Sequence, residues 1–329
     1  MPFMRIFFAK VQKVLSSGEQ WPDIFWWKVA SVLVFFLAAL ASPAEAHIAT
    51  HTAAAASGQE DIDDTEAFFR REKEAQVPII MYHLVTERDR YVGKYGIRPS
   101  ELERDLKYLK ENDYNTVVMQ DLIDFVENGK RLPKKPIVLT FDDGYSSDYN
   151  YLFPLLKEYK MKAVISIIGK AVDESTQEYE KNPAVRLPHL TWAQVAEMHK
   201  DGRVEVQSHG YDVHGRAGSG KLRRESTEAY HRRLAADLQK LQDRCQEYLD
   251  YQPNTFCYPL GVISKESYAV LEELGFKASL SCQEGINIIK QGEKNCLIRL
   301  NRNNRPNGRP IEDVLADIYK DAEKKTGKN

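Results

Sequence analysis

Polar side chains of the kinds that catalyse hydrolysis follow three short apolar segments of this sequence. They are His83 after residues 79–82, Asp142 and Asp143 after residues 137–141, and His209 and His214 after residues 204–208. Carboxylates and imidazoles are costly to desolvate unless they are paired or bind a metal. One carboxylate with two imidazoles also forms the usual open catalytic zinc site, which leaves a coordination position for water. The combination therefore favours a metal-dependent hydrolytic site.

Each of these residues also has an ordinary interpretation when it is taken alone. The Asp143-Gly144 dipeptide is common in turns, and Asp142 could simply cap a helix. A single histidine at the end of a strand, such as His83 or His209, is more often a hydrogen-bonded structural group than a ligand. The metal-site interpretation therefore depends on these side chains meeting in space.

The rest of the sequence predicts a fold that brings them together. From about residue 77 onward, short apolar segments alternate with amphipathic segments of helical spacing. The predicted strands cover residues 77–82, 115–119, 136–141, 163–168, 203–207, 255–258, 276–280 and 297–300. This alternation implies parallel strands covered by helices, and favours an α/β fold of the (β/α) barrel type, complete or distorted. Active sites in such barrels lie at the carboxyl ends of the strands.

Three motifs at these positions resemble the polysaccharide deacetylase family, also known as the NodB-homology or carbohydrate esterase 4 family. They are TFDDGY at residues 140–145, SHGYDVH at residues 208–214 and FCYPLG at residues 256–261. The first motif together with the spaced histidine pair is highly specific, and the resemblance extends over roughly residues 77–318. It implies an enzyme that removes N-acetyl groups from an amino-sugar polysaccharide with the help of zinc.

The resemblance implies a role for each matched residue. Asp143, His209 and His214 would bind the metal, which is expected to be zinc although other divalent transition metals accept the same ligands. Asp142 would be the general base, and the backbone N–H of Tyr145 would donate to the oxyanion. A separate general acid would protonate the departing sugar nitrogen.

The sequence departs from the common family pattern at three places. Four residues separate the two histidines instead of three, the usual arginine of the third motif is absent, and no histidine follows His231. The usual C-terminal general acid is therefore missing. These departures resemble the branch of poly-N-acetylglucosamine deacetylases with a permuted motif order, in which an N-terminal Met-Tyr-His supplies the acid. His83, in Met81-Tyr82-His83, is accordingly predicted to be the general acid.

Four further residues are weaker candidates. Arg299, after the last predicted strand, could orient Asp142, and a surface arginine is the equal alternative. Tyr258, Pro259 and Leu260, in the third motif, are predicted to line the substrate groove.

Two other functions stay open at the level of the sequence. A metal-dependent esterase that removes O-acetyl groups from a polysaccharide would use the same site, and a non-catalytic cell-wall binding module would keep the site idle. The predicted base beside the metal ligands argues against binding alone. Poly-N-acetylglucosamine, peptidoglycan and chitin-like oligomers all remain candidate substrates, and the branch resemblance favours the first.

The first 46 residues have the composition of a secretory signal or an N-terminal membrane anchor. Lysines precede an apolar run over residues 29–41, and the A-x-A sequence 44–46 follows it. The run is shorter than the roughly 20 residues that a membrane span needs, which favours a cleaved signal. The predicted organisation is therefore a signal or anchor over 1–46, a linker over 47–76 and a catalytic domain over 77–329.

The 329 residues have an ordinary globular composition, with 43% hydrophobic residues, 29% charged residues and a formal net charge of -2. This balance gives no reason to expect nucleic acid as a partner. The family resemblance implies an N-acetylated glycan as the partner, and a monomer is expected. The four cysteines include no CxxC pair, which argues against a thiolate zinc site. Their even number permits disulfides in an exported protein, and buried free thiols are the equal alternative.

Overall fold

The computed structural model describes residues 73–215 and 217–326. The chain divides into two units, residues 1–58 and 59–329, and only the second contains described residues. The predicted signal or anchor over residues 1–46 lies outside the described residues, as does most of the predicted linker. The linker prediction was wrong at its end, because the first strand, β1, already begins at Glu74. Among residues 73–215 and 217–326, no helix combines the length and apolar content that a membrane crossing requires.

The centre of the fold is a parallel sheet, as the alternation of apolar and amphipathic segments predicted. Its strands lie in the order β10-β9-β8-β7-β6-β2-β12, and β5 pairs with the start of β6. The strands are β2 (Ile79–Tyr82), β5 (Asn115–Thr116), β6 (Pro136–Asp143), β7 (Ala163–Ile167), β8 (Val204–Ser208), β9 (Thr255–Cys257), β10 (Ala278–Leu280) and β12 (Asn303–Asn304). Side chains on both faces of β6, β7 and β8 are buried, as expected for parallel strands that are covered on both sides.

One segment, residues 300–305, joins the two ends of this sheet. On one side, the Leu300 N–H donates to the Ser279 carbonyl at 2.8 Å, beside β10. On the other side, β12 pairs with β2, and the Arg305 N–H donates to the Met81 carbonyl at 3.1 Å. The sheet therefore closes into a distorted barrel. The predicted closing strand at residues 297–300 was placed slightly early, because residues 294–297 form a 3₁₀ turn instead.

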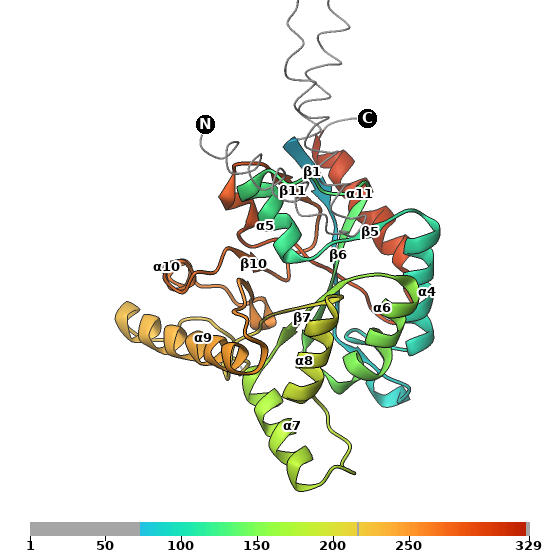
Figure 1. Cartoon of the computed structure of the whole chain (residues 1–329). Helices are drawn as coiled ribbons and strands as arrows, with labels where there is room; N and C mark the ends of the chain where they lie inside the picture. The colour runs from blue at the N-terminus through green and yellow to red at the C-terminus, as the bar shows by residue number, and fades with distance from the viewer. Residues whose placement is uncertain (1–72, 216, 327–329) are drawn as a thin grey trace, which may run out of the picture. The chain divides into compact units, whose positions relative to one another are not determined.

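Helices surround the strands (Figure 1). They are α4 (Pro99–Glu111), α5 (Met119–Asn128), α6 (Phe153–Tyr159), α7 (Gly169–Lys181), α8 (Trp192–Asp201), α9 (Thr227–Leu249), α10 (Ser267–Glu273) and α11 (Ile311–Thr326). Local sequence explains their boundaries. The Thr191 hydroxyl accepts from the Gln194 N–H at the start of α8, and Gly202 ends that helix in the left-handed conformation. In α4, the apolar spacing buries Leu102, Leu106 and Leu109 against the sheet.

Smaller elements complete the chain. β1 (Glu74–Val77) pairs antiparallel with β11 (Asn287–Lys290), and β3 (Leu84–Val85) pairs with β4 (Gly96–Ile97). Within residues 73–215 and 217–326, three short 3₁₀ turns and one π-helical turn lie between the main elements. They are the 3₁₀ turns Asp89–Tyr91, Pro259–Gly261 and Lys294–Leu297, and the π turn Asp148–Leu152 ahead of α6.

Candidate metal centre and active site

The end of β6 presents two neighbouring carboxylates in different directions. Asp143 has a φ of 73°, in the left-handed region, and Gly144 follows with a φ of 68°. A Cβ at Gly144 would lie 3.0 Å from Ile167 Cγ2, which is a tight contact, so both the space and the left-handed φ at this turn favour glycine. Left-handed backbone at a non-glycine residue carries a conformational cost that is typical of functional positions. Asp142 and Asp143 are consecutive residues of β6, so their carboxylates also point to opposite faces of the strand.

The carboxylate of Asp143 faces two imidazoles. Asp143 Oδ1 lies 3.5 Å from His209 Nε2 and 3.3 Å from His214 Nε2. His209 follows β8, and its Nδ1–H donates to the Cys257 carbonyl at 2.8 Å. Because that bond uses the Nδ1 proton, the neutral imidazole presents the Nε2 lone pair toward Asp143. Ligand atoms of Asp143, His209 and His214 all lie within 4.8 Å of one another.

This donor set fits a divalent cation. Asp143 Oδ1 is buried and has no hydrogen-bond partner among the described residues. A carboxylate oxygen and an imidazole lone pair that face each other repel unless a cation or proton lies between them. The three ligands are those of an open catalytic site, and burial with a fixed His209 tautomer matches the usual support of a metal ligand. Asp143, His209 and His214 would therefore hold the metal.

Asp142 is held by different neighbours. Its Oδ1 accepts from Arg302 Nη1 at 2.7 Å, and the Cys257 thiol lies 3.4 Å from the same oxygen. Its Oδ2 faces His83 Nε2 at 3.8 Å. Burial alone would raise the pKa of Asp142, but the Arg302 guanidinium and the nearby His209 and His83 hold it well below its ordinary value. Asp142 is therefore an ionised carboxylate with one oxygen directed toward His83.

His83 lies at the end of β2, where the sequence predicted it. Its side chain is 18% exposed, and its ring contacts that of Tyr95 at a centroid distance of 4.8 Å. Burial lowers the pKa of His83, and the carboxylates of Asp142 and Asp143 oppose that shift only in part. A lowered pKa makes the imidazole a ready proton donor once it is protonated.

Tyr145 lies opposite His189 on a short stretch of antiparallel backbone. The bonds from the Leu190 N–H to the Gly144 carbonyl and from the Ser146 N–H to the Pro188 carbonyl flank this pair. Tyr145 therefore occupies a position whose own N–H points away from residues 188–190. That orientation leaves the N–H available to an oxyanion. Burial, together with Asp143, raises the pKa of the Tyr145 hydroxyl, which stays protonated.

Of the weaker candidates, Arg299 takes the alternative that the sequence left open, a surface arginine. Arg299 is exposed, and its Nη1 donates to the Tyr268 hydroxyl at 3.2 Å; Arg302 holds Asp142 instead. Tyr258 and Pro259 are buried, and the Tyr258 hydroxyl bonds to Ser267 in the core between α9 and α10. Neither side chain is free to line a groove. Leu260 is 56% exposed, at a φ of 57°, and its contact with substrate stays a prediction.

Sequence reasoning missed Arg302 and Cys257 as neighbours of the base. The signal was weak for both. Arg302 lies in an Asn-rich segment without periodicity, and Cys257 belongs to a short apolar segment in which a cysteine is ordinarily a buried core residue. Alternation along β9 explains the second case: Cys257 faces Asp142, and Tyr258 therefore faces the opposite side. The four cysteines, all within the described residues, are free thiols.

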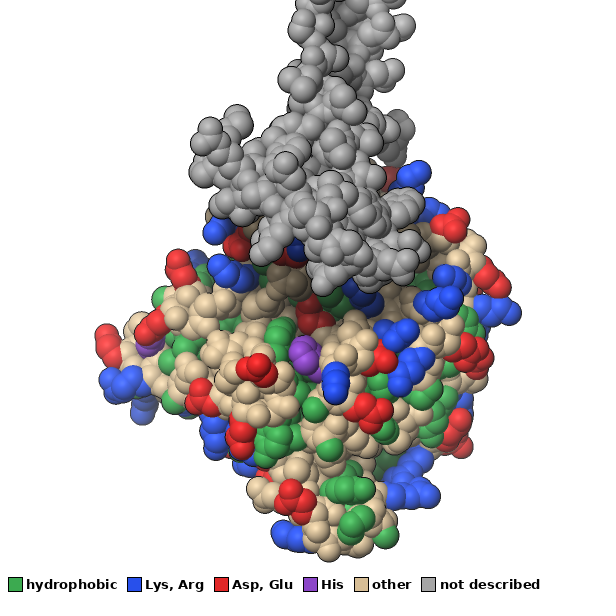
Figure 2. Space-filling view, in the orientation of Figure 1, with side chains coloured by type: hydrophobic (Ala, Val, Ile, Leu, Met, Phe, Trp, Pro, Cys, Tyr) green, Lys and Arg blue, Asp and Glu red, His purple; other side chains and the backbone are tan. Residues whose placement is uncertain are grey.

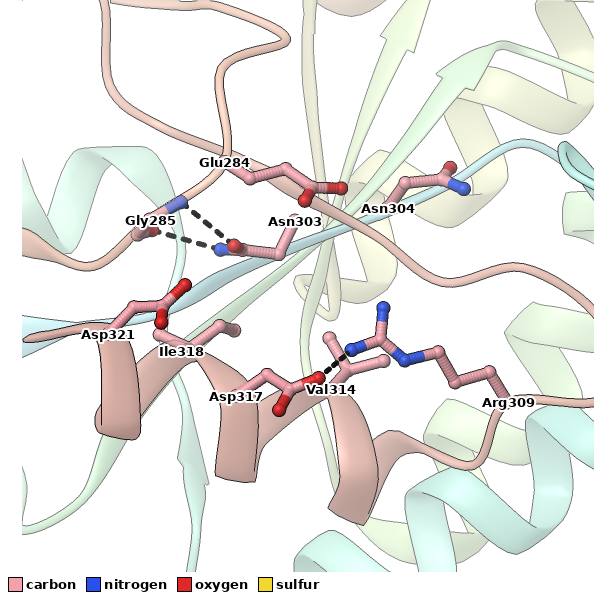
Figure 3. A pocket seen from close by; sticks show the side chains of 9 residues that line it. All are labelled: Glu284, Gly285, Asn303, Asn304, Arg309, Val314, Asp317, Ile318 and Asp321. Carbon is pink, nitrogen blue, oxygen red and sulfur yellow. Dashed lines mark hydrogen bonds and ion pairs between the residues drawn. The ribbon is translucent and has the colours of Figure 1, made fainter.

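A small cavity of about 70 Å³ lies apart from these residues, between β12 and α11 (Figure 3). The Asn303 side chain bonds across it to the backbone of Gly285, and Arg309 pairs with Asp317 on α11. None of the predicted site residues lines this cavity. On the visible face of the molecule, basic and acidic side chains are interspersed (Figure 2). The chemistry is therefore concentrated at the carboxyl ends of β2, β6 and β8.

Comparisons with known proteins agree with this geometry. Residues 129–279 match the family model described as polysaccharide deacetylase. YxkH, a Bacillus subtilis (strain 168) protein named as a polysaccharide deacetylase, is 29% identical over 71% of this chain and 74% of its own length. The poly-β-1,6-N-acetyl-D-glucosamine N-deacetylase of Escherichia coli (strain K12) is 28% identical over 58% of this chain. The alignment covers only 31% of that longer protein.

A solved structure extends the similarity to three dimensions. The de-N-acetylase from Aggregatibacter actinomycetemcomitans superposes with a TM-score of 0.62 and 25% sequence identity, over 74% of this chain and 99% of that one. The fold and the clustered acids and histidines define a barrel-type hydrolase with a candidate metal centre. Residues 129–279 therefore carry a polysaccharide deacetylase domain of the NodB-homology, carbohydrate esterase 4 type, and the chain is an enzyme that resembles members of that family. Enzymes of this family use a divalent metal.

Proposed function

We propose that this enzyme removes N-acetyl groups from an N-acetylglucosamine-containing polysaccharide outside the cytoplasmic membrane, with zinc as its metal. The main support for this proposal is that the two adjacent aspartates have different neighbours. Asp143 faces the two imidazoles, whereas Asp142 keeps one oxygen directed toward His83. A binding module has no use for an ionised carboxylate that is fixed beside a metal site and does not belong to it.

The residues divide the reaction among them. Asp143, His209 and His214 would hold a divalent cation, whose Lewis acidity would lower the pKa of a water to about 7 and polarise a carbonyl. Asp142 takes a proton from the attacking water, and Arg302 keeps its carboxylate ionised and oriented. The Tyr145 N–H donates to the oxygen of the acetamide as negative charge develops there.

His83 completes the reaction as the general acid. The departing sugar nitrogen must be protonated, because an amide anion is a very poor leaving group. His83 Nε2 lies 3.8 Å from Asp142 Oδ2, so both groups reach the same reacting centre. The proton that Asp142 removes can pass through His83 to the nitrogen, which leaves acetate and a free amine as products.

Similarity supports the choice of polymer. Relatives from Escherichia coli and Staphylococcus aureus are named poly-β-1,6-N-acetyl-D-glucosamine N-deacetylases, with 28% and 25% identity. We therefore propose poly-N-acetylglucosamine as the preferred substrate. Export through the N-terminal 46 residues, with or without their removal, follows from their sequence pattern, and fractionation of cells with N-terminal sequencing tests it.

Acetate release tests the function. The purified enzyme is incubated with a panel of N-acetylglucosamine polymers and an O-acetylated xylan, with zinc and with a chelator. We expect chelator-sensitive release from an N-acetylated polymer, and a loss of about 10²- to 10⁴-fold in kcat for Asp142→Asn, because the general base is removed. Release from the O-acetylated polymer alone would reassign the enzyme as an esterase. Metal binding without any release would reduce it to a glycan-binding module.

A further inference from the structure

The loop that joins the two histidines of the candidate metal centre is held from two sides by groups that the reaction itself does not use. This loop, residues 210–213, turns tightly. Gly210 has a φ of 82°, and a Cβ there would lie 2.3 Å from Val213 Cγ2. Only glycine fits, so the turn is built into the sequence.

The first support comes from the amino end of α7. The Gly169 N–H donates to the Gly210 carbonyl at 3.1 Å, and the Lys170 N–H donates to the Tyr211 carbonyl at 2.9 Å. N–H groups in the first turn of a helix have no partner within the helix, so they are free to bind a loop. These bonds hold the carbonyl groups of residues 210 and 211 in place.

The second support is one side chain from the middle of α9. Asp237 Oδ1 accepts from the Tyr211 N–H at 2.7 Å, and Asp237 Oδ2 accepts from the Asp212 N–H at 2.8 Å. A carboxylate accepts at both oxygens, so one aspartate satisfies two consecutive peptide groups. Between them, α7 and Asp237 bind two carbonyls and two N–H groups of the loop.

We propose that Asp237 is a positioning residue for the metal: it fixes residues 210–213 so that His209 Nε2 and His214 Nε2 both face Asp143. The inference rests on the metal-dependent function proposed above. A loop of four residues has many conformations, and each one lost on metal binding would weaken the affinity. The bonds to Asp237 remove that freedom before the ion arrives, which preorganises the two imidazoles.

The exposed side chains around the loop contribute less. Lys170 Nζ lies 2.9 Å from Asp212 Oδ2, but both side chains are about half exposed, and such ion pairs stabilise little. Asp243 offers a matched control for Asp237. It lies on the same helix, and its one hydrogen bond among the described residues comes from Gln239, four residues away on the surface. Asp243→Asn therefore makes the same chemical change on α9 without touching the loop.

Zinc affinity tests the proposal. It is measured on the full chain by competition with a chromophoric chelator, for the wild type, Asp237→Asn, Asp237→Glu and Asp243→Asn. Asp237→Asn is expected to weaken zinc binding by about 10- to 100-fold, because the amide nitrogen replaces one acceptor and faces an N–H group. Asp237→Glu keeps both oxygens and should recover part of the affinity. Asp243→Asn should stay within about twofold of the wild type, since it contacts no part of the loop.

Thermal unfolding separates positioning from a general loss of stability. Saturating zinc raises the Tm of a protein that binds it. If Asp237 is a positioning residue, Asp237→Asn should reduce this zinc-induced increase in Tm by more than it reduces the Tm of the zinc-free protein. Unchanged zinc affinity, or a lower Tm with a full zinc-induced increase, would overturn the role of Asp237 and leave the proposed function intact. A wild-type chain that binds no zinc would overturn both.

Discussion

Two buried arginines on the segment that closes the barrel each hold an aspartate, and they leave it in different chemical situations. Arg302 and Arg305 are both fully buried, three residues apart. Arg305 places Nη2 at 2.9 Å from Asp105 Oδ1 and Nε at 2.7 Å from Oδ2. Tyr82 then donates its hydroxyl to Asp105 Oδ2 at 3.0 Å. Both oxygens of Asp105 therefore accept hydrogen bonds, and this ion pair links α4 to the barrel.

The Arg302 pair is incomplete by comparison. Arg302 Nε donates to the Ser281 carbonyl at 2.8 Å, and Arg302 Nη1 donates to one oxygen of Asp142. The second oxygen faces His83 without a hydrogen bond to it, at 3.8 Å. An Arg–Asp pair is thus structural at Asp105, where both carboxylate oxygens accept hydrogen bonds. At Asp142 one carboxylate oxygen stays open, so that carboxylate can take part in a reaction. A site can be recognised by what its ion pair leaves unsatisfied.

The largest expected effects come from removing each arginine. Arg302→Met and Arg305→Met should each lower the free energy of unfolding by about 3–5 kcal/mol, because each leaves a buried carboxylate without its partner. Only Arg302→Met should also lower kcat of the folded enzyme, by about 100-fold, because the base is no longer held in place. Urea unfolding and acetate release measure the two quantities. Equal activity losses in both variants would contradict the comparison.

The pH dependence sharpens the same prediction. Arg302 contributes to holding the pKa of Asp142 below its ordinary value, so its removal should raise that pKa. A base works only when it is ionised, so the acid limb of the kcat profile should move to higher pH in Arg302→Met. Arg302→Lys serves as a second variant if Arg302→Met does not fold. It keeps the charge but cannot reproduce the planar fork, so a smaller shift is expected.

The contrast between the two pairs also shows what the sequence could predict. The convergence of His83, Asp142, Asp143, His209 and His214 followed from parallel strands whose carboxyl ends meet, and the motifs singled out the same positions. The arginine was misassigned to Arg299, because the closing strand was placed at residues 297–300 rather than at Asn303–Asn304. In a strand, a shift of one residue turns every side chain to the other face, so periodicity alone could not select Arg302.

Residues that support the site from helices were beyond sequence reasoning for another reason. Asp105 and Asp237 lie in amphipathic helices, where a carboxylate ordinarily belongs to the solvated face. Asp105 is nevertheless fully buried, and Asp237 binds two loop N–H groups. Their partners are 200 and about 26 residues away along the chain, respectively. Only the tertiary structure shows such contacts, because no local spacing relates the partners.

A third buried carboxyl shows what burial does without an arginine. Glu205, on β8, accepts from the Met119 and Gln120 N–H groups at the start of α5 and from Gln207. Burial raises the pKa of Glu205 to about 7, from an ordinary 4.5, although these three donors oppose the shift. The folded state therefore binds the proton more tightly than the unfolded state. The resulting stability is fully present below pH 4.5 and is lost as the pH rises through 7.

This difference predicts that Glu205→Gln gains stability relative to the wild type as the pH rises. Each pKa unit corresponds to about 1.4 kcal/mol, so the gain between pH 4.5 and pH 7 should reach about 3 kcal/mol. Urea unfolding of both proteins across this range measures it, and the shared contribution of the histidines cancels in the difference. Parallel stability curves would show that the three donors, rather than burial, set the charge of Glu205.

The smallest expected effect concerns the hydroxyl that completes the Arg305 pair. Burial and the neighbouring Asp105 raise the pKa of Tyr82 well above its ordinary value, so the hydroxyl stays protonated and donates. Tyr82→Phe removes that donor but keeps the ring, which stacks on Phe141 at 4.8 Å. We expect a loss of about 1.5 kcal/mol in the free energy of unfolding, typical of a hydrogen bond to a charged group, and unchanged kcat. Tyr82 precedes His83 in the sequence, so an effect on catalysis would show that the two ion pairs are coupled. A tenfold loss of kcat, equivalent to about 1.4 kcal/mol in the activation free energy, would be such a result.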